Sequence, residues 1–314
     1  MAKIVGFGEC VLDFSSQQVE EDGTTTFRAC PGGSVANLCV ATARLGQESA
    51  FVGQVGADPF GHALQKCLRQ YGVHTDGMLF SDSYGTLLAF ATRQADSDVS
   101  YHFGNMPSAD KFVRYSDLPL ALFQEADLVH VSSCAMAEGE TQITEAKLLR
   151  TLRQWNKIVS YDVNYRAMQY KSMEEARRVT QIPLGYADIV KATEEELALV
   201  TGRRGAAGIE ALLLGGASVV LITRGSDGSS WHIPGASGDV PVPRVRAVDP
   251  VGAGDCYLGA FLSRVADTED IHTISAEAVR SAAEFASRAA AICVTRRGAM
   301  AGMPTLQEVE NASL

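Results

Sequence analysis

The chain alternates short, continuously apolar runs with longer helical patterns over most of its length. Runs of this kind are typical of strands that are buried on both faces of a parallel sheet. They lie at residues 3–7, 51–55, 128–132, 157–162, 188–191 and 218–223, and helical patterns separate them at 34–45, 60–71, 141–155, 194–200 and 205–214. The alternation implies right-handed crossovers. The sequence therefore predicts a doubly wound α/β fold, with a mostly parallel sheet covered by helices on both faces.

Two segments interrupt this alternation, at approximately 11–31 and 86–104. Their strand-like pieces, with a polar turn at 94–98, are 24–30, 86–93 and 99–103. We expect a small β-sheet at the edge of the core, where it forms a lid over the carboxyl ends of the main strands. Further helices are predicted at 253–265 and 275–292. The length suits one domain over 1–314, a single large core with this small lid.

Composition excludes several classes of protein. The 27 Lys plus Arg and 37 Asp plus Glu give a formal charge of −10, whereas nucleic-acid binding requires clustered basic residues. The apolar run at 4–7 is too short for a signal peptide or a membrane span, so we expect a cytoplasmic protein with no membrane partner. Seven scattered cysteines without C-x-x-C spacing predict reduced thiols rather than disulfides or a zinc ribbon.

The segment Gly252-Ala253-Gly254-Asp255 carries the strongest chemical signal. Its small residues allow a tight turn, and the apolar run that follows predicts a helix whose N-terminus binds an anion. Asp255 lies in the first turn, where it can accept a proton from a hydroxyl while the backbone amides hold a phosphoryl group. The alternative is that Asp255 only caps the helix.

A second glycine pair, Gly32-Gly33, also precedes a predicted helix, with Asn37 one turn inside it. Glycines let a sugar ring approach the backbone, and an Asn side chain offers its hydroxyls both a donor and an acceptor. Asp13 lies beyond the first strand and can accept hydrogen bonds from two adjacent hydroxyls. The alternative for the glycine pair is an ordinary helix start. The third glycine of a dinucleotide fingerprint is missing after Gly6-x-Gly8, and no P-loop sequence occurs.

Taken together, these residues resemble the two signatures of the PfkB, or ribokinase-like, carbohydrate kinase family. The first match contains Gly32, Gly33 and Asn37 with Gly46 and Gly56, and the second is 249–255. The resemblance covers essentially the whole chain. It implies a ribokinase-like fold and an ATP-dependent kinase that transfers the γ-phosphate to a primary hydroxyl of a small sugar. It also implies the base and the anion hole of the reaction, which fall on Asp255 and on the amides of Gly252, Ala253 and Gly254.

The same resemblance implies an ATP site and a magnesium site. The strand-end turn beside the nucleotide falls on Thr223, Gly225, Ser226 and Gly228. In a D-x-N-x-R segment, Asn164 is expected to face the phosphates and Arg166 the sugar or phosphate oxygens. The N-x-x-E motif falls on 193–196, where Thr193 replaces the asparagine and Glu196 is expected to bind Mg²⁺ through water. A solvated acidic helix start is the alternative for this run.

Many family members also bind a monovalent cation beside the anion hole. The matching segments are 249–251 and 293–299, and their backbone would bind K⁺ at Asp249, Val251, Cys293, Arg296 and Gly298.

The segments 107–110, 162–166 and 191–197 resemble the fructokinase branch most closely. Its usual F-Y-R is Phe103-Gly104-Asn105 here, and Phe103 is expected to contact the sugar. Fructose is the first choice of substrate, with aminoimidazole riboside, ribose and 2-keto-3-deoxygluconate as alternatives in the same reaction class. A catalytically silent regulator that binds a sugar or nucleoside is the alternative of another class. We also expect a homodimer formed through the lid.

Overall fold

The structure is a computed structural model that describes residues 3–19, 22, 24–93 and 99–312. The turn predicted at 94–98 lies outside the described residues. The large sheet has nine strands in the order β13-β12-β11-β10-β9-β8-β1-β4-β5. Their bounds are β1 Lys3–Phe7, β4 Glu48–Gly56, β5 Met78–Ser81, β8 Leu128–Ser132, β9 Ile158–Asp162, β10 Ile189–Thr193, β11 Val219–Thr223, β12 Ser229–Ile233 and β13 Ala236–Val240.

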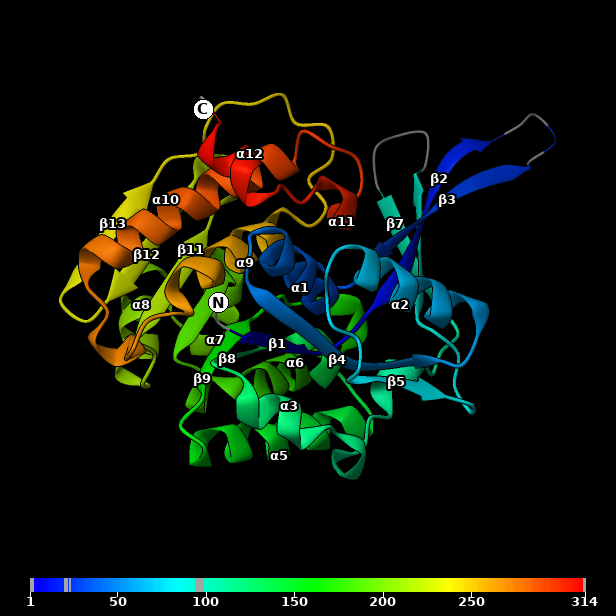
Figure 1. The fold of residues 1–314 in the computed structure, drawn as a ribbon, viewed down its shortest axis with the longest axis horizontal. Coiled ribbons are helices and arrows are strands. Elements are labelled where there is room, and N and C mark those ends of the chain that lie inside the picture. Colours follow the sequence, from blue (N-terminus) through cyan, green and yellow to red (C-terminus); the bar gives the residue numbers. More distant parts are fainter. Residues whose placement is uncertain (1–2, 20–21, 23, 94–98, 313–314) are drawn as a thin grey trace.

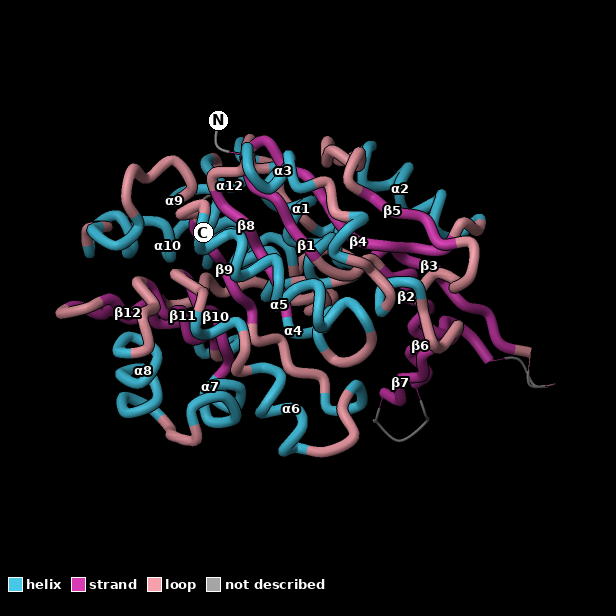
Figure 2. The backbone as a smooth tube through the Cα atoms, turned by 90° about the horizontal axis from the view of Figure 1, so that it is seen from below, coloured by secondary structure: helices cyan, strands magenta, loops and turns pink. Residues whose placement is uncertain are grey.

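Neighbouring strands from β11 to β5 pair in parallel, and the β11–β12 and β12–β13 pairs are antiparallel. The prediction of a mostly parallel sheet is confirmed. The carboxyl ends of the parallel strands therefore share one edge of the sheet, which is where ligands bind in open α/β folds. The tube view in Figure 2 shows these strands side by side through the middle of the molecule.

Helices cover both faces of this sheet, as predicted (Figure 1). Strand residues alternate between two hydrophobic clusters, because successive side chains point to opposite faces. Leu221 packs in the first cluster and Ile222 in the second. The first cluster contains residues of α1 Ser34–Arg44, α2 Pro59–Gln70, α9 Ala253–Val265, α10 Ala276–Cys293 and α12 Leu306–Glu310. The second contains residues of α3 Leu120–Glu125, α5 Glu140–Gln154, α7 Glu194–Thr201 and α8 Gly205–Leu214.

The remaining α-helices of the described residues are short. They are α4 Ser133–Met136, α6 Met173–Thr180 and α11 Ala299–Gly302.

A separate four-stranded sheet projects from one end of the molecule in both views (Figures 1 and 2). Its order is β3-β2-β6-β7, with bounds β2 Val11–Val19, β3 Thr25–Gly32, β6 Leu88–Arg93 and β7 Val99–Gly104. β2 and β6 pair in parallel, and the two outer pairs are antiparallel. Phe14 of β2 stacks on Phe90 of β6, with ring centroids 4.9 Å apart, and meets Phe60 of α2 edge-on. These aromatic contacts join the small sheet to the core.

Candidate active site

Helix α9 begins at the edge of the large sheet, where the sequence predicts an anion hole. Gly252, the residue before it, has a left-handed φ of 82°, and a Cβ there would lie 2.7 Å from the Cβ of Ala299. Glycine therefore suits this position on both counts. Ala253 N donates to Pro250 O at 3.2 Å. The amides of Gly252, Gly254 and Asp255 have no acceptor among the described residues, so three N–H groups remain for an anion.

Two side chains of α1 hold the Asp255 carboxylate. Ser34 Oγ donates to Oδ1 at 2.9 Å, and Asn37 Nδ2 donates to Oδ2 at 2.8 Å. Burial raises the pKa of Asp255, whereas the hydrogen bond from Asn37 and the positive charges of Lys191 and Arg166 act in the opposite direction. The carboxylate is therefore partly buried and oriented by neutral donors, an arrangement that suits a general base.

The glycine pair before α1 brings the chain close to β2 and to the loop that joins β1 to β2. A Cβ at Gly32 would lie 2.2 Å from Asp13 Oδ2, and a Cβ at Gly33 would lie 2.6 Å from Glu9 O. Gly33 also has a φ of 101°. Burial and the nearby charge of Asp255 raise the pKa of Asp13 to about 6. The structure thus brings Asp13, Gly32, Gly33, Asn37 and Asp255 together.

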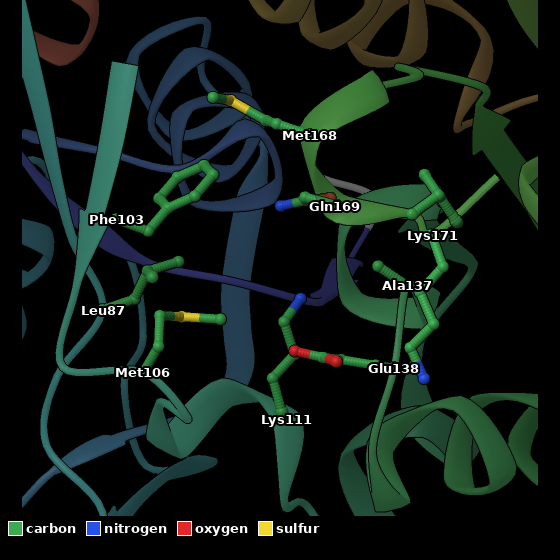
Figure 3. A pocket seen from close by; sticks show the side chains of 10 residues that line it. Leu87, Phe103, Met106, Lys111, Ala137, Glu138, Met168, Gln169 and Lys171 are labelled. Atoms are coloured by element: carbon green, nitrogen blue, oxygen red, sulfur yellow. The ribbon is translucent and has the colours of Figure 1, made fainter.

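A pocket of about 200 Å³ opens between the small sheet and the segment 168–171. Leu87, Phe103 and Met106 form one wall, 168–171 form the opposite wall, and the ammonium of Lys111 points between them (Figure 3). We call this cavity the Phe103 pocket. It is smaller than the roughly 300–1,000 Å³ typical of sites for drug-sized ligands. The pocket therefore suits a small molecule.

Asn105 occupies the position where the fructokinase pattern has an arginine. Its side chain donates to the backbone oxygen of Thr86 at 2.9 Å. A buried cation in this region is Lys111, which donates to Cys134 O at 2.7 Å and lies 3.3 Å from Asp110 Oδ2. Sequence reasoning missed Lys111, although the directly preceding Asp110 belongs to a segment that it singled out.

Two more carboxylates are buried near Lys111. Glu9 Oε1 accepts a hydrogen bond from Ser34 N at 2.7 Å. Burial raises the pKa of Glu9 to about 7, while its backbone hydrogen bonds and the charge of Lys111 lower it. Glu145 of α5 is fully buried, and burial raises its pKa well above the ordinary range. Among the described residues, neither Glu145 oxygen has a hydrogen-bond partner. A protonated Glu145 avoids the cost of an unpaired buried charge.

The predicted nucleotide residues lie at or after the ends of β11 and β9, the two strands on either side of β10. Thr223 ends β11, and the turn after it contains Gly225, Ser226 and Gly228, with positive φ at both glycines. Asn164 follows β9 with a φ of 37°. Its Nδ2 lies 3.6 Å from Cys134 Sγ, so the side chain turns toward the Cys134 thiol.

Arg166, two residues after Asn164, donates to the Tyr165 carbonyl at 3.2 Å. Its charge reaches Asp255 and Cys134, because it lowers the pKa of both groups. Arg166 thus lies within electrostatic range of both Asp255 and Cys134, whose own backbone oxygen accepts from Lys111. Of the predicted sugar residues, Phe103 lines the Phe103 pocket, whereas Asp13, Gly32, Gly33, Asn37 and Arg166 are not among its lining residues.

The predicted magnesium residue Glu196 belongs to a capping box at the start of α7. Its Oε2 accepts from Thr193 N and its Oε1 accepts from Tyr165 N, both at 2.8 Å, and Thr193 Oγ1 accepts from Glu196 N. Thr193 therefore does the capping work that an asparagine would do, since both residue types are good N-caps. Both Glu196 oxygens keep a lone pair for a water molecule.

The two segments predicted to bind K⁺ lie side by side. Asp249 accepts from the amides of Gly298 at 2.9 Å and Val251 at 3.1 Å. The amides of Val248 and Asp249 both donate to Val294 O. Among the other predicted ligands, Cys293 O accepts from Arg296 N at 3.1 Å. Within the described ranges, no cluster of three or more His, Cys, Asp or Glu side chains is arranged to hold a metal ion.

Free amides that bind an anion beside a carboxylate that takes a proton are the machinery of a phosphotransferase. Comparison with known proteins gives the family. Residues 1–306 match the description "pfkB family carbohydrate kinase", and the chain belongs to that family. It is an ATP-dependent carbohydrate kinase with the ribokinase-like fold, as its sequence motifs predict.

Several of the similar proteins are named fructokinases. The chain is 33% identical to a probable fructokinase-2 of Arabidopsis thaliana, over 96% of this chain and 93% of the relative. A fructokinase of Xylella fastidiosa with bound ATP superposes with a TM-score of 0.91 at 32% identity, covering 98% and 97% of the two chains. A fructokinase of Vibrio cholerae O395 in its fructose-, ADP- and calcium-bound form superposes with a TM-score of 0.88 at 29% identity, covering 99% of this chain and 98% of the other.

None of the helices in the described part of the chain has the length and apolarity to cross a bilayer.

Proposed function

We propose that the acceptor of this kinase is fructose and that Asp255 is the general base. One observation carries the assignment of the base: Ser34 and Asn37 orient the Asp255 carboxylate at a helix N-terminus whose amides are free. The similarity to fructokinases of plants and bacteria supports fructose.

In the proposed reaction, Asp255 accepts the proton of a primary hydroxyl of the sugar. The hydroxyl oxygen forms a bond to the γ-phosphorus, and the bond from phosphorus to the ADP oxygen breaks with its electron pair on ADP. The free amides of Gly252, Gly254 and Asp255 donate to the transferring phosphoryl group, with the dipole of α9 behind them. Catalysis rests on positioning and charge stabilisation.

The sugar lies between the glycine pair and the small sheet, which acts as a lid. Asn37 Oδ1 is buried and has no partner within the described residues, so it is open to a sugar hydroxyl. Asp13 accepts from adjacent hydroxyls, and Gly32 and Gly33 let the ring approach the backbone. Phe103 is proposed to cover the ring from the small sheet, where it lies on β7. Arg166 lies near the phosphoryl oxygens.

ATP lies along the ends of β9 and β11, with Asn164, Thr223, Gly225, Ser226 and Gly228 beside it. Mg²⁺, when bound, neutralises phosphate charge. Glu196 fits Mg²⁺ through water, because backbone amides already occupy one lone pair of each carboxylate oxygen.

For K⁺, we propose a site between the segments 249–251 and 293–299, with backbone ligands at Asp249, Val251, Cys293, Arg296 and Gly298.

We further propose a homodimer formed through the lid. The cytoplasm is the proposed compartment, since the seven cysteines are free.

A screen of ATP consumption tests the substrate. Fructose, ribose, aminoimidazole riboside and 2-keto-3-deoxygluconate are compared with Mg²⁺, in K⁺ and in Na⁺ buffers, with a reaction without sugar as the control. We expect the highest kcat/KM with fructose and a higher rate in K⁺. A kcat/KM at least tenfold higher for another sugar would overturn the assignment to fructose, and equal rates in both buffers would overturn the K⁺ site.

A further inference from the structure

Lys191 is a buried lysine that the sequence analysis did not assign to the site. It lies in the middle of β10, and only 6% of its surface is exposed. Its Nζ donates to Asp162 Oδ2 at 2.9 Å and to Oδ1 at 3.1 Å. Burying an ammonium group is costly unless it is paired. The pair with Asp162 explains how the lysine is tolerated, but not why a lysine is there.

The position of the ammonium gives the reason. A Cβ built on Gly254 would lie 3.0 Å from Lys191 Nζ, so the ammonium faces the first turn of α9. An ammonium group has three N–H donors. Within the described residues, both hydrogen bonds of Lys191 go to the one carboxylate of Asp162. The third N–H of the ammonium therefore has no acceptor among the described residues, and it lies near the free amides of Gly254 and Asp255.

The positive charge of Lys191 also acts on Asp255. It lowers the pKa of the Asp255 carboxyl, whereas burial raises that pKa. The other charged groups that face Asp255 are Asp13 of β2, Arg166 of the loop after β9, and Asp162 at the end of β9. Lys191 and Arg166 are the two cations in this set. Of the two, Lys191 is fixed by a carboxylate pair and is the more buried.

We infer that Lys191 is a further catalytic residue, whose third N–H donates to a non-bridging oxygen of the transferring phosphoryl group, and that Asp162 positions it. This inference rests on the proposed function of Asp255 and the α9 amides. Lys191 keeps its proton throughout: the proton of the sugar goes to Asp255, and the electron pair of the breaking bond goes to ADP. The lysine adds a full positive charge to an anion hole otherwise made of amide dipoles.

The test compares two buried lysines that are each paired with an aspartate. Lys191→Met alone leaves Asp162 buried without a partner, so Lys191→Met with Asp162→Asn is measured as well. Lys111→Met is the matched control, because Lys111 is similarly buried and paired with Asp110 but lies on the Phe103 pocket. Circular dichroism and thermal unfolding establish that each variant folds.

We expect both Lys191 variants to lose about 10²–10³ in kcat with fructose, as for loss of one oxyanion-hole donor, and with little change in the KM of the sugar. In Lys191→Met the acid limb of kcat/KM against pH should move to higher pH, because Asp255 loses a nearby cation while Asp162 keeps its charge. In Lys111→Met the acid limb should stay in place. A folded double variant with kcat within about threefold of wild type would overturn the role of Lys191, and so would an unmoved acid limb in folded Lys191→Met.

A binding measurement separates failure of this inference from failure of the proposed function. Calorimetry gives the affinity of the wild type and of the double variant for a non-hydrolysable ATP analogue and for ADP, both with Mg²⁺. If Lys191 binds the γ-phosphate, the ratio of the two affinities should fall by about tenfold or more in the variant, the worth of a charge-assisted hydrogen bond. An unchanged ratio contradicts the inference even if no sugar is phosphorylated, and a wild type inactive on fructose contradicts only the proposed function.

Discussion

Asp255 illustrates how a single side chain acquires a role from its neighbours. A carboxylate in the first turn of a helix is commonly a cap. Here α9 has no side-chain cap hydrogen bond at its start, and the carboxylate instead accepts from Ser34 and Asn37. The hydrogen-bond partners therefore favour the role of a base over that of a cap.

Replacing this carboxylate with an amide tests that role. Asp255→Asn keeps the shape but cannot accept a proton, so kcat should fall at least 10²–10⁴-fold, the usual contribution of a general base. Sugar binding should survive, because Asp13 and Asn37 remain. Turnover is measured by coupled ATP consumption, and fructose binding by calorimetry. Phosphorylation at the wild-type rate would contradict the proposed base.

Glu9 makes stability depend on pH. Its pKa is about 7 in the folded protein and 4.5 when exposed, so between these values the folded state holds a proton that the unfolded chain releases. This contribution to stability is fully present below pH 4.5 and is lost as the pH rises through 7. One pKa unit is worth about 1.4 kcal/mol, which gives about 3 kcal/mol in all.

Glu9→Gln removes this titration while it keeps an oxygen for Ser34 N. The difference in free energy of unfolding between Glu9→Gln and wild type should grow in favour of the variant by about 3 kcal/mol from pH 4.5 to 7.5. Urea denaturation at a series of pH values measures it. A difference that stays constant over this range would show that Glu9 does not carry a raised pKa.

Among the elements, most central strands and long helices were predictable, and three strands of the large sheet were not. The helical patterns at 205–214 and 253–265 have the bounds of α8 and α9. Sequence reasoning missed β5, whose four residues alternate too little to show a period, β12, whose run contains two serines and a histidine, and β13, whose sequence Ala-Ser-Gly-Asp-Val is polar. β5 and β13 lie at edges of the sheet, where partial exposure weakens the apolar pattern on which such predictions depend.

The site was predictable where backbone geometry demands particular residues. Gly33 and Gly252 have conformations that other residues rarely adopt, and so they mark the two turns. The roles of Lys191 and Lys111 could not be predicted from sequence, because Lys191 pairs with Asp162, 29 residues away, and Lys111 bonds to Cys134, 23 residues away, as well as to its neighbour Asp110. Only the fold brings such residues together.

The N-cap of helix α7, Thr193, helps to position Glu196 of the proposed magnesium site. Thr193→Ala should cost about 1 kcal/mol of unfolding free energy and lower kcat, since it loosens the start of the helix that holds Glu196. Thr193→Asn should stay near wild type in both. Thr305 caps α12 in the same way, at the other capping box. Thr305→Ala should cost similar stability without lowering kcat. An equal kcat in the Thr193→Ala and Thr305→Ala variants would show that the position of Glu196 does not affect catalysis.

At the scale of the whole molecule, net charge and local potential point in opposite directions. A formal charge of −10 gives a field that repels an anionic nucleotide. The site opposes it with the N-terminus of α9, Lys191 and Arg166 at one edge of the sheet. These groups act at short range, whereas the acidic surface is distant and is screened by salt. Moderate salt should therefore weaken the repulsion of the nucleotide more than it weakens the contacts that bind the nucleotide.

The proposed homodimer would form through the small sheet. β3 is an edge strand of that sheet, and edge strands readily pair with another chain. Residues 26–29 on this strand are exposed, and among them Phe27 is a large hydrophobic side chain. An edge strand with an exposed aromatic side chain is a surface that dimerisation would bury.

Sedimentation equilibrium at micromolar concentration tests the proposed homodimer. Wild type should sediment as a dimer, and Phe27→Asp should shift it toward monomer, because a buried carboxylate in the new interface would be unpaired. Leu214→Asp is the control: Leu214 is 81% exposed at the end of α8 and belongs to the core rather than the small sheet, so this variant should remain dimeric. A monomeric wild type would rule out the dimer, and dissociation by Leu214→Asp alone would move the interface from the lid to α8.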